Sequence, residues 1–118
     1  MARTLIALVM LLIAAPGSAQ EDLKSGNAML PHCKRALSYI PPDSGADVPL
    51  ALCLGAVMGI ASTADRLPPE ARFCPPPSVT PDQLVRVVVQ YLEAHPARLH
   101  ENFFQLAYQA MHAAWPCN

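Results

Sequence analysis

The chain has 118 residues, of which 53% are hydrophobic, with 8 Lys and Arg against 9 Asp and Glu, 13 Pro and 4 Cys. This length fits a single domain of ordinary size. The charge is close to zero and the basic residues form no cluster, so the electrostatic attraction on which nucleic-acid binding depends is excluded.

The first 19 residues differ in composition from the rest. Fourteen of them are apolar, and Arg3 is their only charged residue. An apolar run at residues 5–15, followed by small residues up to Ala19, is typical of a secretory signal peptide and is too short to span a membrane. We therefore expect residues 1–19 to be removed after Ala19, leaving a mature domain of residues 20–118.

All four cysteines, Cys33, Cys53, Cys74 and Cys117, lie in this mature domain. An even number of cysteines in an exported chain indicates two disulfides, and the histidines and cysteines lack the spacing of a zinc site. Spacing alone does not choose among the three possible pairings. The pairing that we prefer is Cys33–Cys53 with Cys74–Cys117. It would join the first two helices and tie the entry of the third helix to the end of the fourth.

Prolines divide the mature chain into four segments with helical periodicity. The first helix is expected at residues 25–38, with Leu30, Cys33 and Leu37 on one face. Pro31 is unfavourable inside a helix and tolerated in a first turn. Its position therefore predicts either a kink or a regular helix that begins only near Leu30.

The second helix is expected at residues 48–64, a stretch without any charged residue that is typical of a buried helix. Ala51, Gly55 and Gly59 recur at intervals of four and form a smooth strip. We interpret the strip as a place where a neighbouring helix of the same domain packs closely. The alternative is an association face for another chain.

The third helix has the clearest boundary. Thr80 fits an N-cap, Pro81 the first helical position, and Gln83 the third position of a capping box. The apolar arc of residues 84–92 is wider than one core contact needs, an apolar surplus that agrees with a binding role.

The fourth helix is expected between Pro96 and Pro116 and carries two apolar stripes. One stripe consists of Leu99, Phe103, Leu106, Ala110 and Ala114. The other consists of Phe104, Tyr108, Met111 and Trp115. One stripe suffices for the core of a small domain. We therefore expect Phe104, Tyr108 and Trp115 to contact a partner subunit.

These elements predict an all-α protein, a small four-helix bundle stapled by two disulfides. The sequence lacks a nucleophile motif with an oriented base, a pair of carboxylates suited to glycoside cleavage, and a phosphate-binding glycine loop. No catalytic residue, metal ligand or cofactor is therefore expected. A binding role is what remains.

Specific motifs add to this interpretation. CLGAVMGIA at residues 53–61 opens a helix with a cysteine and a G-x-x-x-G pattern. Residues 73–117 hold a Cys-Pro before a Thr-capped helix, the junction YLEAHP and a closing Trp-Pro-Cys. Together they resemble the Rap/Tai family, periplasmic immunity proteins of type VI secretion. The resemblance implies an all-α, disulfide-bonded domain, usually a homodimer, that binds and blocks a peptidoglycan amidase effector.

The sequence leaves two questions about binding open. A small helical acid-stress chaperone of the periplasm, or another secreted binding protein, is the alternative function. For the contact with a partner we single out Pro75, Pro76, Pro77 and Ser78, because proline stiffens this segment and Cys74 anchors it. The alternative is that the whole stretch of residues 66–78 is a plain linker.

Overall fold

The computed structural model describes residues 24–38 and 48–118, so the expected signal peptide and its cleavage site lie outside the described residues. The described part contains four α-helices and no strand, which confirms the all-α prediction. The helices are α2 (Gly26–Leu37), α3 (Val48–Ala61), α4 (Pro81–Ala94) and α5 (Phe103–Ala114). Three single-turn 3₁₀ helices connect them: η2 (Ala64–Arg66), η3 (Pro69–Ala71) and η4 (Pro96–Arg98).

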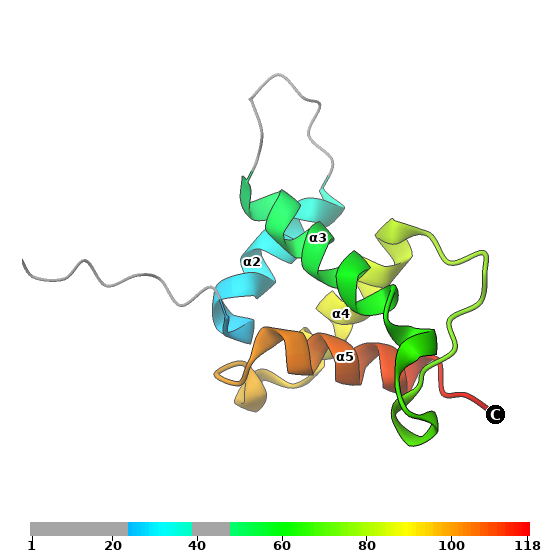
Figure 1. Ribbon diagram of the computed structural model, residues 1–118. Helices are drawn as coiled ribbons and strands as arrows, with labels where there is room; N and C mark the ends of the chain where they lie inside the picture. Colours follow the sequence, from blue (N-terminus) through cyan, green and yellow to red (C-terminus); the bar gives the residue numbers. More distant parts are fainter. Residues whose placement is uncertain (1–23, 39–47) are drawn as a thin grey trace, which may run out of the picture.

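The four helices enclose one core. Figure 1 shows α2 beside α3, α5 crossing below them, and α4 behind, in contact with all three. Each helix contributes a fully buried side chain: Cys33, Val57, Val88 and Leu106 have exposed fractions of 0%. Five residues of the wide apolar arc of α4 are buried, because this helix contacts all three of the others.

Helix α2 begins before Leu30, the residue near which one of the two alternatives for Pro31 placed the start of regular helix. The Ser25 side chain caps it by accepting a hydrogen bond of 3.1 Å from the Ala28 amide. The helix is continuous from Gly26 through Pro31, so the expectation that it begins only near Leu30 is wrong. The cap and the tertiary packing of α2 outweigh the local cost of an exposed proline in its second turn.

Helix α3 ends at Ala61, three residues before the predicted end. The hydroxyl of Ser62 donates to the Gly59 carbonyl and that of Thr63 to the Ile60 carbonyl, both at 2.7 Å. These bonds satisfy carbonyl groups that the end of a helix leaves free, which explains the early stop.

The predicted burial of α3 is correct on one side only. Cys53 and Val57 are fully buried, whereas Ala51, Gly55 and Gly59 are exposed. A Cβ atom built on either glycine meets nothing within 4 Å among the described residues. The interpretation of the glycine strip as an internal packing site is therefore wrong, because no helix of the described part covers it.

Helix α4 begins as the sequence predicts. Thr80 is its N-cap and accepts a hydrogen bond of 3.2 Å from the Gln83 amide, and Pro81 occupies the first helical position. The cap fixes the point at which the proline-rich stretch passes into regular helix.

Helix α5 begins seven residues after Pro96, later than predicted. Pro96 opens η4, and the chain enters α5 only at Asn102, whose side chain accepts hydrogen bonds from the Phe104 and Gln105 amides at 2.9 and 3.3 Å. Leu99 therefore lies before the helix and does not belong to its apolar stripe.

Both preferred disulfides are present. Cys33–Cys53 joins α2 to α3 inside the core, with a Cα–Cα distance of 5.2 Å. Cys74–Cys117 joins the chain before α4 to the residues after α5, at 5.0 Å. The first disulfide fixes the packing of α2 against α3, and the second ties the chain that leads into α4 to the C-terminal end of α5.

Candidate partner-binding surfaces

The proline segment, defined as Pro75, Pro76, Pro77 and Ser78, follows an anchored stretch of chain. Phe73 is buried, with an exposed fraction of 2%. The Cys74 amide donates a hydrogen bond of 2.8 Å to the Trp115 carbonyl, beside the disulfide to Cys117. The start of the segment is therefore held by a side chain in the core, a backbone bond and a covalent bond.

The proline segment itself is exposed at Pro76, Pro77 and Ser78 and half-buried at Pro75. The Val79 amide donates to the Pro76 carbonyl at 3.1 Å, which closes a turn just before the α4 cap. A hollow of about 460 Å³ adjoins the segment; its lining residues are Ala61, Ala64, Asp65, Arg72, Phe73, Cys74 and Pro75. The segment is thus an exposed turn fixed at both ends, a shape suited to contact with another protein.

The three aromatic residues predicted to contact a partner subunit differ in exposure. Phe104 is exposed, at 47%, whereas Tyr108 and Trp115 are half-buried and pack against the core. The Tyr108 hydroxyl donates to the Ala71 carbonyl at 2.8 Å and so ties α5 to η3. The structure gives Tyr108 and Trp115 contacts within the chain and leaves Phe104 available on the surface.

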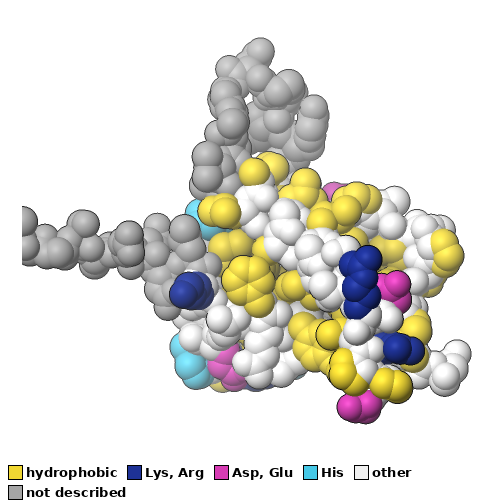
Figure 2. Space-filling view, viewed as in Figure 1, with side chains coloured by type: hydrophobic (Ala, Val, Ile, Leu, Met, Phe, Trp, Pro, Cys, Tyr) yellow, Lys and Arg dark blue, Asp and Glu magenta, His cyan; other side chains and the backbone are white. Residues whose placement is uncertain are grey.

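A second apolar surface lies on α3. Its outer face is defined as the residues that are exposed between positions 50 and 61 of this helix, namely Ala51, Leu52, Gly55, Met58 and Gly59. Figure 2 shows hydrophobic side chains along this helix, which has no charged residue. The sequence pointed to the glycines, but not to the exposure of Leu52 and Met58, because a helix that is apolar all round does not reveal which side is inside.

A groove of about 350 Å³ runs beside this outer face. Its lining residues are Gly55, Ala56, Gly59, Ile60, Thr63 and Phe104. The groove is therefore shared between α3 and the first turn of α5, and among its described lining residues only Thr63 is polar.

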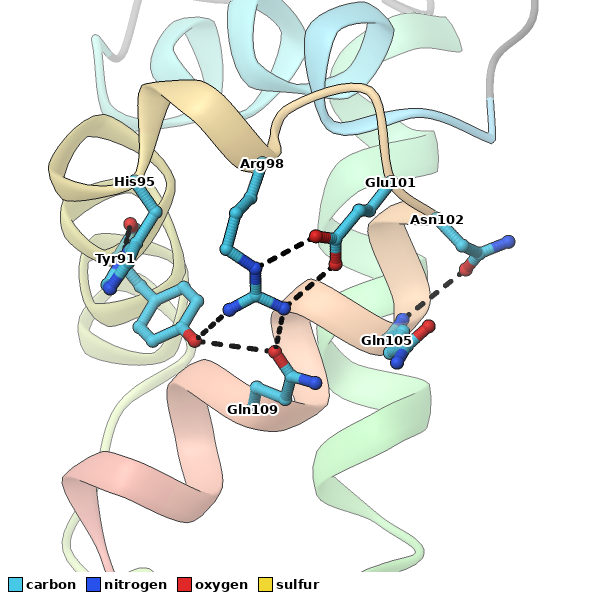
Figure 3. A network of polar contacts seen from close by, with 7 residues as sticks. All are labelled: Tyr91, His95, Arg98, Glu101, Asn102, Gln105 and Gln109. Atoms are coloured by element: carbon cyan, nitrogen blue, oxygen red, sulfur yellow. Dashed lines mark hydrogen bonds and ion pairs between the residues drawn. The ribbon is translucent and has the colours of Figure 1, made fainter.

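A network of polar contacts joins η4 to α4 and α5 (Figure 3). Arg98 makes two hydrogen bonds to the Glu101 carboxylate, at 2.9 and 2.8 Å. It also donates to the Tyr91 hydroxyl at 2.8 Å and to the Gln109 side-chain oxygen. Only the three-residue spacing of Arg98 and Glu101 could have indicated this network from the sequence, because Tyr91 and Gln109 meet them only in the folded chain.

The network is built for holding three elements together. The hydrogen bonds from Arg98 lower the pKa of the Glu101 carboxyl, and those to Glu101 and Tyr91 raise the pKa of the Arg98 guanidinium. Both groups are thus held in their charged forms. A carboxylate fixed in this way has no tendency to take up a proton at neutral pH, so the cluster fits a structural clamp better than an acid–base site.

The part of the chain that the structure describes holds no group of three or more His, Cys, Asp or Glu residues arranged to bind a metal ion. In the same residues, no helix is both long and apolar enough to cross a membrane. Exposed apolar side chains occur in both the proline segment and the outer face of α3.

Comparison with protein families gives one match. The model described as Rap1a immunity proteins matches residues 25–117, from the N-cap of α2 to the last disulfide cysteine. Neither the curated proteins nor the solved structures yield a significant match.

Proposed function

Because this chain belongs to the Rap1a immunity protein family, we propose that it is a periplasmic inhibitor that binds and blocks a peptidoglycan amidase delivered by type VI secretion. The observation that carries this proposal is the family match over residues 25–117. Family membership implies binding to a secreted effector, and an inhibitor rather than an enzyme. An inhibitor needs only to fill the cleft of its target, and a rigid all-α domain with exposed, fixed segments is suited to that task.

The proposed site of action is the periplasm. Two disulfides agree with an oxidising compartment, and the composition of residues 1–19 agrees with export. Intact mass measurement of the protein recovered from a periplasmic extract tests this point. The expected mature chain starts at Gln20, and a full-length chain retained in the cytoplasm would contradict it.

We propose that the proline segment makes the contact with the effector. Three prolines in succession restrict the backbone before binding, so little conformational entropy is lost when the turn enters a cleft. The Cys74–Cys117 disulfide and the Thr80 cap hold the two ends of the segment in place.

The function is tested with a cell-wall hydrolase effector, chosen from any that is found encoded beside the gene of this chain. The purified mature protein is expected to bind that hydrolase and to stop its cleavage of isolated peptidoglycan. Cells that receive the hydrolase in the periplasm are expected to survive only when this chain is produced with it. Lack of binding and protection would refute the proposal. Suppression of protein aggregation only at acidic pH would instead favour the acid-stress chaperone.

The contact is tested by replacing Pro75, Pro76 and Pro77 with serine. If the segment enters the target, inhibition weakens by at least about tenfold, a loss equal to one good interface contact. Pro68→Ser is the matched control, because Pro68 is an exposed proline in the same connection between α3 and α4. Equal inhibition by the triple variant and the wild type would remove the segment from the interface.

A further inference from the structure

The hollow of about 460 Å³ beside the proline segment lies in the connection between α3 and α4, near the C-terminal end of the chain (Figure 1). The end of α3 and η2 supply one wall, and residues 72–75 supply the other. The volume lies within the range of ordinary ligand pockets. Because Pro75 belongs to both the hollow and the proline segment, a partner that contacts one of them is in reach of the other.

The walls of the hollow are fixed by the fold. Its lining residues Ala64 and Phe73 belong to the core, with exposed fractions of 7% and 2%. The Tyr108 hydroxyl donates to the Ala71 carbonyl, directly before the second wall, and Cys74 in that wall is held by its disulfide. The hollow is therefore a preformed shape, and a partner that fills it does not have to order the walls first.

Two exposed residues of opposite charge, Asp65 and Arg72, line the hollow. The ion pairs within the described residues are Lys34–Glu93, Arg86–Asp82 and Arg98–Glu101. In that part of the chain, Asp65 and Arg72 therefore have no charged partner and are not paired with each other. The hollow thus offers one carboxylate and one guanidinium whose charges are not neutralised by a neighbour.

Arg72 is held in position without being neutralised. Its Nε atom donates a hydrogen bond of 2.6 Å to the Leu67 carbonyl. The two terminal nitrogens of its guanidinium have no hydrogen-bond partner within the described residues. A guanidinium presents its N–H groups as a planar fork that matches the two oxygens of a carboxylate. Arg72 is therefore suited to bind a carboxylate that a partner brings into the hollow.

We propose that the hollow binds a segment of the effector that carries one acidic and one basic side chain, with the carboxylate on Arg72 and the cation on Asp65. This step rests on the proposed function and names the chemistry of its partner. A segment with charges of one sign only would bring a charge close to a like charge in the hollow, which weakens a contact. The two residues therefore select among effectors as well as binding one.

The first test measures the dissociation constant between the mature protein and the hydrolase effector used to test the function, by calorimetry. Arg72→Glu and Asp65→Lys are each expected to raise this constant by at least about tenfold. Arg72→Lys keeps the charge without the fork and is expected to have an intermediate effect. Arg66→Glu and Glu70→Lys are the matched controls, because they reverse the same charges at exposed positions outside the hollow, and both are expected to bind like the wild type.

Folding of each variant is checked by urea unfolding. Arg72→Glu removes the hydrogen bond to the Leu67 carbonyl, so its effect on binding is compared with that of Asp65→Lys. The Asp65 side chain has no hydrogen bond or ion pair to lose within the described residues. A loss of binding by Asp65→Lys with an unchanged unfolding midpoint therefore reports on the hollow and not on the fold.

The second test needs no effector. Short blocked peptides are added to isotope-labelled mature protein, and the backbone amide signals are followed by NMR. One peptide alternates glutamate and lysine, one contains only glutamate, and one contains only lysine. The alternating peptide is expected to shift the amide signals of Ala64 and Phe73 most, and Arg72→Glu is expected to lose this shift.

Equal binding of the effector by the wild type, Arg72→Glu and Asp65→Lys would overturn the proposal for the hollow, while inhibition by the wild type would leave the proposed function standing. So would a loss of binding as large in the two controls, or amide shifts that are absent or equal for all three peptides. A chain that inhibits no hydrolase would refute the proposed function. Shifts confined to the alternating peptide would then still support a hollow that binds paired charges.

Discussion

Gly26 at the start of α2 offers a sharp test of the packing, since glycine there is required by its neighbours and not by its backbone angles. A Cβ atom at this position would lie 2.9 Å from Leu106 Cδ1, 3.0 Å from the Leu99 carbonyl oxygen and 3.2 Å from Leu99 Cα. The leucine methyl can rotate away. The Leu99 backbone is less free, because its carbonyl accepts the Asn27 amide at 2.8 Å, beside the bond of 3.0 Å from the Gly26 amide to the Glu101 carbonyl.

The size of the effect follows from two opposing contributions. Replacing glycine by alanine in a helix favours folding by roughly 0.5–1 kcal/mol, and less in the first turn. Forcing a methyl group into a filled space typically costs 1–3 kcal/mol. Because two of the three contacts are with backbone, we expect the steric cost to win, and Gly26→Ala to lower the free energy of unfolding by about 1–2 kcal/mol.

Urea unfolding followed by circular dichroism measures this difference. Gly26→Ala is expected to lower the midpoint without changing the slope of the transition. Asn27→Ala is the matched control: this neighbour is exposed, and alanine there is expected to be neutral or slightly stabilising. A Gly26→Ala chain as stable as the wild type would show that the contact between α2 and the Leu99 backbone is not tightly packed.

Three further predictions concern an ion pair, a disulfide and a hydrogen bond that stabilise the fold. Because Arg98 lowers the pKa of Glu101, the ion pair of these two residues stabilises the fold above the ordinary carboxyl pKa, and this stability is lost as the pH falls through the lowered value. Glu101→Gln should therefore flatten the acid side of a plot of urea midpoint against pH. An unchanged plot would contradict a stabilising role of this pair. Replacing both Cys74 and Cys117 with serine should lower the free energy of unfolding by about 4 kcal/mol for a sequence separation of 43, on the chain-entropy estimate, and calorimetry showing no loss would mean that the second disulfide is dispensable. Tyr108→Phe removes a single hydrogen bond and should lower the free energy of unfolding by about 1 kcal/mol with no change in molar mass; dissociation of a dimer would instead place the hydroxyl at an interface.

The helix boundaries could be predicted where local chemistry decides them. Thr80 and Gln83 predict an N-cap at the start of α4, and in the structure the Gln83 amide donates to the Thr80 hydroxyl. Asn102 is likewise an N-cap residue with a glutamine, Gln105, three positions later, and it begins α5. The predicted start was nevertheless placed directly after Pro96. The reason is physical: proline at a first helical position suits a single 3₁₀ turn as well as a full helix, and only the cap of the next helix tells them apart.

What could not be predicted depends on contacts between distant segments. The pattern of Gly55 and Gly59 is the same whether a helix packs inside the domain or faces outward, so periodicity cannot choose between them. Likewise nothing in the residues around Gly26 shows that the Leu99 backbone will lie against it. The candidate binding surfaces share this limitation, because exposure follows from how four helices divide a single core.

The order of the two disulfides also bears on how the chain reaches its fold. The first cysteine is bonded to the second, Cys33 to Cys53, and the third to the fourth, Cys74 to Cys117, so the two covalent loops are separate and not interleaved. If the chain is oxidised while it emerges with its N-terminal end first, Cys33 meets Cys53 before the other cysteines, and Cys74 then meets Cys117. Correct pairing then needs only an oxidant, and no enzyme that reshuffles wrong bonds.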